Sequence, residues 1–200
     1  MLNRKTLYVC SDNEEDLVYQ KEKRKLSIIL LKEDVFIKII QINKEDRLEK
    51  LLKENISSTF SYYDILTHYK RVKYNGESYL VIYFLKYYNY LKDIINKAKD
   101  VKIKPYEFTK KFKMKNKGIN IIVREFKDEI YLVASVKQTI IYTKHFKKGE
   151  EVNYYVDKCL EQLKETFNIE SFKLFIQENL YNNKLYELTK NIELIKGKVR

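Results

Sequence analysis

Apolar and polar positions along the chain follow two periods, which together predict a mixture of strands and helices. Short apolar runs rich in β-branched residues are typical of strands. The predicted strands cover residues 6–10, 26–31, 35–42, 65–73, 79–85, 101–103, 119–124, 130–136, 139–146, 172–176 and 192–195. Apolar residues spaced by three and four predict amphipathic helices over 44–55, 87–99, 151–167 and 180–189. Interleaved strands and helices favour an α/β fold in which helices cover mixed sheets.

Local signals predict how some of these elements are connected. Asn75-Gly76 stands between two apolar strands, and both residues accept a positive φ, so this pair predicts a tight hairpin. Asn43 is predicted to cap the following helix, whose first turn would carry Glu45 and Asp46. The hairpin and the predicted meander over 119–146 mean that the sheets cannot be purely parallel.

A lysine-rich segment over residues 110–118 is the best candidate for a boundary between two parts of the chain. It predicts an N-terminal subdomain over 1–109 that contains an inserted hairpin and helix. The C-terminal subdomain would cover 110–200 and contain a three-stranded meander, a helix, a strand, a helix and a strand.

The composition supports a folded protein and leaves the meaning of its charge open. Hydrophobic residues make up 44% of the 200 residues, which is enough for a sizeable core. The net charge of +12 comes mainly from lysines scattered along the whole chain. Such a charge can reflect the codon bias of an AT-rich genome, or selected attraction to nucleic acid or to an anionic membrane.

Motifs that carry catalysis, nucleotide binding or metal binding are missing from the sequence. A phosphate cradle needs closely spaced glycines, but the four glycines lie far apart and form no GxxxxGK[ST] or GxGxxG motif. Cys10, Cys159, His68 and His145 have no spacing that suits a zinc site. We therefore expect no catalytic residues, no cofactor and no metal, and we interpret the protein as a binding scaffold and not an enzyme.

The start of the chain shows no signal peptide, and no stretch approaches 18 uncharged apolar residues. We therefore expect a cytoplasmic protein.

Tyrosines interleaved with lysines form the candidate binding region. The residues predicted to bind a partner are Tyr62, Tyr63, Tyr69, Tyr87, Tyr88 and Tyr90. Tyrosine provides a large contact area at a low entropy cost in protein interfaces. Aromatic rings beside cations can also stack on bases and hold phosphates. The third interpretation is structural, because tyrosine is a common residue on half-buried sheet faces.

The order of the segments resembles a known family. Residues 35–56, 60–98, 119–151 and 172–195 look like the successive elements of the type IV pilus assembly protein PilM and of the cytoplasmic domain of its type II secretion counterpart GspL. The resemblance implies an actin-like (RNase H-like) fold of two subdomains, reduced in size.

This resemblance also implies a function without nucleotide. ATP-binding actin-like proteins place glycines after particular strands, whereas the matching positions here, 10–12, 124–126 and 177–179, contain none. Glu125 and Glu178 would add negative charge beside a triphosphate.

The family resemblance implies an adaptor at the cytoplasmic face of the inner membrane. Such an adaptor binds the cytoplasmic tail of a single-span membrane protein and connects it to an assembly ATPase. The alternative function is that of a nucleic-acid-binding protein with a basic, tyrosine-rich surface.

Overall fold

The computed structural model describes residues 5–9, 26–31, 35–59, 65–86, 100–111, 118–169 and 171–196. The chain divides into two compact units, Met1–Lys104 and Pro105–Arg200. The boundary drawn from the sequence between residues 109 and 110 falls a little later, inside helix α3 (Lys104–Lys111). The predicted helix over 87–99 lies outside the described residues.

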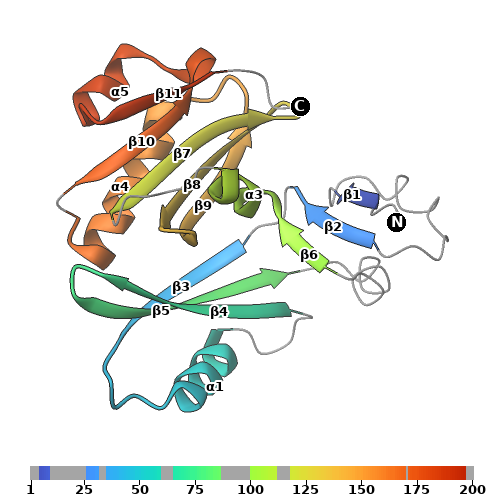
Figure 1. Cartoon of the computed structure of the whole chain (residues 1–200), viewed down its shortest axis with the longest axis vertical. Helices are drawn as coiled ribbons and strands as arrows, with labels where there is room; N and C mark the ends of the chain where they lie inside the picture. Colours follow the sequence, from blue (N-terminus) through green and yellow to red (C-terminus); the bar gives the residue numbers. More distant parts are fainter. Residues whose placement is uncertain are drawn as a thin grey trace. The chain divides into compact units, whose positions relative to one another are not determined.

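The first unit contains two separate three-stranded sheets (Figure 1). One is parallel, in the order β1-β2-β6, and is built from β1 (Lys5–Val9), β2 (Leu26–Leu30) and β6 (Asp100–Ile103). The other is antiparallel, in the order β3-β5-β4, and is built from β3 (Val35–Ile42), β4 (Ile65–Tyr74) and β5 (Glu77–Lys86). All of these strands were predicted, with ends that differ by a few residues at most.

Helix α1 (Leu48–Thr59) lies against one face of the antiparallel sheet (Figure 1). The sheet contributes buried and partly buried side chains to this contact, and the helix contributes the partly buried residues of its apolar stripe. The strand residues are Ile40, Ile42, Ile65, Leu80, Ile82 and Phe84, and the helix residues are Leu48, Leu51, Leu52 and Ile56. Full burial of one such side chain contributes about 1.5–3 kcal/mol; each partly buried helix residue contributes a fraction of that, and together they hold α1 on the sheet.

The prediction that Asn43 caps this helix is wrong. The Asn43 backbone N–H instead donates to the Asp46 carboxylate at 2.7 Å, and the Asp46 N–H donates to the Asn43 carbonyl at 3.3 Å. These bonds close a separate turn, which competes with helical hydrogen bonding. The helix therefore begins at Leu48, four residues after the predicted start at residue 44.

The predicted hairpin is confirmed. Strands β4 and β5 pair from Ile65↔Lys86 to Tyr74↔Glu77, which leaves Asn75 and Gly76 as a two-residue turn. Their φ angles are 47° and 84°, and such positive values suit the twist of the two flanking strands.

The second unit is a five-stranded mixed sheet with helices on its faces (Figure 1). Its order is β11-β10-β7-β8-β9. The strands are β7 (Ile119–Phe126), β8 (Glu129–Val136), β9 (Thr139–Lys147), β10 (Phe172–Gln177) and β11 (Ile192–Ile195). Strands β7, β8 and β9 form the predicted antiparallel meander, whereas β10 runs parallel to both β7 and β11.

Helix α4 (Val152–Phe167) covers one face of this sheet and agrees with its prediction. Its buried residues are Val152, Val156, Cys159, Leu160, Leu163 and Phe167. The ring of Tyr155 stacks on Phe146 of β9 at 4.0 Å between centroids. Burial raises the pKa of the Cys159 thiol and raises that of Tyr142 to about 12, so neither group ionises near neutral pH.

The helix predicted over 180–189 is shorter than expected. The chain forms a 3-10 turn, η2 (Glu178–Leu180), then an extended step at Tyr181, and only then α5 (Asn183–Leu188). The Asn182 side chain accepts a hydrogen bond from the Leu185 N–H at 3.2 Å and caps the helix. Asparagine stabilises a helix more as a cap than inside it, so the helix starts after Asn182.

Candidate functional site

The carboxyl ends of strands β7 and β10 meet at the centre of the five-stranded sheet. These two strands are parallel neighbours, paired from Phe172↔Ile119 to Ile176↔Val123. After β7 the chain turns to β8 on one side, and after β10 it continues to β11 on the other side. Such a reversal of connection is where open α/β sheets place their ligand sites.

A polar cluster of four side chains fills this position: Glu125, Lys148, Gln177 and Asn179. The Glu125 carboxylate accepts hydrogen bonds from Lys148 Nζ and from Asn179 Nδ2, each at 2.9 Å. The Glu125 backbone N–H donates to Gln177 Oε1 at 3.1 Å. We call these four residues the strand-end cluster.

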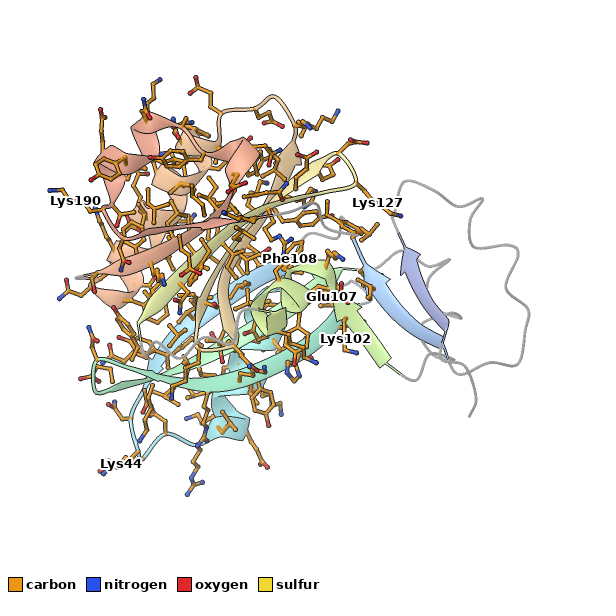
Figure 2. The ribbon with its side chains drawn as sticks, turned by 45° about the horizontal axis from the view of Figure 1, so that its top comes forward. Lys44, Lys102, Glu107, Phe108, Lys127 and Lys190 are labelled. Carbon is orange, nitrogen blue, oxygen red and sulfur yellow. The ribbon has the colours of Figure 1, made fainter. Side chains whose placement is uncertain are left out.

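The cluster joins three connections that are distant in sequence. Glu125 precedes the β7–β8 turn, which Lys127 marks in Figure 2. Lys148 lies in the turn between β9 and α4, and Asn179 lies in η2 after β10. The structure thus brings together two of the positions, 124–126 and 177–179, that the sequence resemblance had aligned with phosphate-binding glycines.

The charges of the cluster are satisfied internally. Only 18% of the Glu125 side chain is exposed, against 57% for Lys148. The hydrogen bond and the negative charge of Glu125 raise the pKa of the Lys148 ammonium, so it stays protonated. A partly buried carboxylate is an acceptor and carries negative charge, whereas a phosphate needs hydrogen-bond donors, so Glu125 itself does not favour an anion.

A buried cation lies next to the cluster. Arg124 is 7% exposed, and its burial lowers the pKa of the guanidinium. The guanidinium lies 5.6 Å from the ring of Phe108, which projects from α3 (Figure 2). The Phe108 ring meets Tyr131 of β8 edge to face at 5.6 Å. Arg124 is therefore built into the packing of α3 on the sheet.

Sequence reasoning missed Lys148, Phe108 and the packed position of Arg124. Lys148 is one of many lysines in the sequence, and only the pairing of β8 with β9 brings its turn close to Glu125. Residues 10–12, the third predicted phosphate position, lie outside the described residues. Across the ranges given above, no group of three or more His, Cys, Asp or Glu side chains is arranged to hold a metal ion.

The structure describes one of the six candidate binding tyrosines. Tyr62, Tyr63, Tyr87, Tyr88 and Tyr90 lie outside the described residues, so their role stays a prediction. Tyr69 lies on β4 and is 45% exposed.

The strand around Tyr69 presents further polar and basic groups. Thr67, Arg71 and Lys73 are exposed, and they share one face of the sheet with Tyr69. On the opposite face, the ring of His68 stacks on Tyr83 of β5 at 5.9 Å. Burial, with a smaller contribution from the charge of Lys70, lowers the pKa of His68, so this ring is neutral at pH 7.

Within the described ranges, none of the helices is both long and apolar enough to cross a membrane.

Known proteins share the fold of this chain but not its sequence. No family model and no curated protein matches the sequence. The solved structures similar to it include the PilM-PilN type IV pilus biogenesis complex, with 10% identity and a TM-score of 0.50. That match covers 87% of this chain and 70% of the other chain.

Two further structures are similar at lower scores. A Bacteroides thetaiotaomicron protein with an actin-like ATPase fold and unknown function has 15% identity and a TM-score of 0.46, covering 90% of this chain and 74% of its own. The cytoplasmic domain of EpsL, an inner-membrane component of the type II secretion system of Vibrio cholerae, has 12% identity and a TM-score of 0.44, covering 88% and 66%.

These similarities concern the fold. The predicted α/β class with mixed sheets and an actin-like fold is confirmed, and the resemblance to PilM holds at the level of the fold.

Proposed function

We propose that this protein is a nucleotide-independent scaffold of a pilus or secretion-type assembly, which binds the cytoplasmic tail of an inner-membrane partner. Two observations support the proposal. The fold resembles that of the PilM-PilN complex over 87% of the chain. The strand-end cluster includes residues from 124–126 and 177–179, the positions that the sequence resemblance aligns with phosphate-binding glycines.

The position of the Glu125 carboxylate at the strand ends is the observation that carries this proposal. The carboxylate accepts hydrogen bonds from Lys148 and Asn179 at 2.9 Å each, so one donor of each side chain is already engaged by a carboxylate and not by a phosphate. At about 4 Å, two unit negative charges repel by about 1 kcal/mol in water and about 4 kcal/mol near a protein surface. A triphosphate carries several such charges, and Lys148 is already paired.

A thermal-shift titration with Mg²⁺-ATP tests the nucleotide part of the proposal. A ligand at 100 times its Kd stabilises a protein by about 2.7 kcal/mol, which for a domain of this size raises the Tm by about 5–10 °C. We expect no such rise at millimolar Mg²⁺-ATP, and the same result with Mg²⁺-GTP. A saturable rise would contradict the proposal.

Affinity purification from detergent-solubilised membranes tests the adaptor part. The tagged full chain should retain an integral membrane protein at both low and high salt. If only nucleic acid is retained, and it leaves at high salt as counterion release predicts, the adaptor role is wrong and the nucleic-acid alternative replaces it.

A further inference from the structure

Strand β4 is a long strand at the edge of its sheet. It pairs with β5 along its whole length, Ile65–Tyr74, and within the described ranges no strand pairs with its other side. An edge strand presents a row of backbone N–H and C=O groups that can pair with an added strand. Its 10 residues exceed the usual strand length of about 5–6, so an added segment would find a long template.

A row of alternate side chains on one face of β4 is accessible. Tyr69 stands opposite Ile82 and Arg71 stands opposite Leu80 in the antiparallel pairing, so they share a face with these buried residues. That face is the one against which α1 packs on β5. However, Tyr69, Arg71 and Lys73 are exposed, so a row of reachable side chains follows the free edge.

This row is basic. It carries Arg71 and Lys73, and no residue of β4 is acidic. Neither Arg71 nor Lys73 forms an ion pair with any other described residue. Two copies of β4 would set like charges against each other, and lysine on an edge is a known device against self-pairing. The strand therefore disfavours a second copy of itself and favours a segment of opposite charge.

We propose that β4 binds, by strand addition, an extended acidic segment of the partner protein. Backbone hydrogen bonds to the edge would provide affinity, and alternate side chains would provide specificity. Acidic residues two apart would lie opposite Arg71 and Lys73, and the next residue on that face would be apolar or aromatic and lie against Tyr69. This inference rests on the proposed adaptor role and specifies the chemistry of the segment that the adaptor binds.

A peptide titration on the full chain tests the charge requirement. The probe is a short fluorescein-labelled peptide in which Glu alternates with Val, and binding is followed by anisotropy at low salt. The Arg71→Glu/Lys73→Glu variant replaces two attractive cross-strand pairs by repulsive ones. It should bind the acidic peptide roughly tenfold more weakly, or weaker still. The same double variant should bind the matching peptide in which Lys alternates with Val.

A variant with the same change in net charge serves as the control. Lys44 and Lys190 are exposed residues outside β4 (Figure 2). The Lys44→Glu/Lys190→Glu variant should bind the acidic peptide as the unmodified protein does. Equal weakening in both double variants would show a response to overall charge only and would overturn the proposal.

Backbone methylation tests strand addition itself. Two versions of the acidic peptide are made. In one, the backbone N–H groups that point to one edge of the extended peptide are methylated; in the other, those that point to the opposite edge are methylated. Strand addition requires that one set blocks binding and that the other set leaves it intact. Equal binding of both peptides would overturn the proposal. Displacement of the acidic peptide by oligothymidylate, with steep salt dependence, would assign the surface to nucleic acid instead.

The membrane purification separates this inference from the adaptor role. If Arg71→Glu/Lys73→Glu retains the membrane partner as well as the unmodified protein does, β4 is not the site and the adaptor role stands. If neither protein retains a partner, the adaptor role fails, and with it the identity proposed for the segment.

Discussion

Single residues in this protein act through partners that are far away in sequence. Glu125 is the clearest case, because its carboxylate and its backbone N–H together meet Lys148, Asn179 and Gln177. Each contact is an ordinary hydrogen bond or ion pair, yet together they hold three connections at one end of the sheet. A residue with this role should affect stability more than an exposed charge does.

The variant Glu125→Ala tests that role. It removes the acceptor of Lys148 and Asn179, and we expect it to lower the free energy of unfolding by about 1–2 kcal/mol. Urea denaturation followed by circular dichroism measures the change. Lys158→Ala is the matched control, because Lys158 forms an exposed pair with Glu161 in which both side chains are at least half exposed. It should cause no measurable change; equal losses in both variants would mean that the cluster has no special role.

At the scale of elements, short-range sequence signals and tertiary contacts contribute differently. The β4–β5 hairpin needs only the Asn75-Gly76 turn and two apolar strands, so it is specified locally. The start of α1 depends instead on the competing Asn43–Asp46 turn. Helix α5 is short because Asn182 takes the capping position.

The hairpin turn offers a prediction with an internal control. Gly76 has a φ of 84°, a conformation that costs an L-residue about 1–2 kcal/mol. Gly76→Ala should therefore lower the free energy of unfolding by that amount. Gly118→Ala should be close to neutral, because Gly118 has no positive φ and nothing lies within 4 Å of an added Cβ. Thermal and urea unfolding of both variants compare the two sites, and an equal effect would contradict the assigned turn geometry.

At the scale of the whole molecule, the chain is organised as two units that each contain their own sheets. In the second unit, β8 is buried along its entire length, and the apolar face of α4 is buried as well. A five-stranded sheet with such a core can be expected to fold without the rest of the chain.

A fragment covering residues 104–200 tests this organisation, because it keeps α3 and all five strands of the second unit. We expect native-like far-UV circular dichroism and a single cooperative urea transition. A gradual change without a transition would show that the second unit depends on the first. Comparing its urea unfolding with that of the full chain would then show how much stability the fragment loses.

The amino-acid sequence determined much of the local structure. Apolar runs located every described strand, the period of α4 located its helix, and Asn75-Gly76 specified its turn, because these features depend on side-chain period and backbone preference. The order of these elements also sufficed to identify the actin-like fold class.

Only the tertiary structure decided which polar residues meet at the strand ends. Glu125 and Asn179 are 54 residues apart, and Glu125 and Lys148 are 23 apart. Their contact follows from the pairing of β7 with β10 and with the meander, a long-range arrangement that no local preference encodes. For the same reason, the sequence marked Tyr69 and its basic neighbours as a candidate surface, but only the pairing of β4 placed them along an edge.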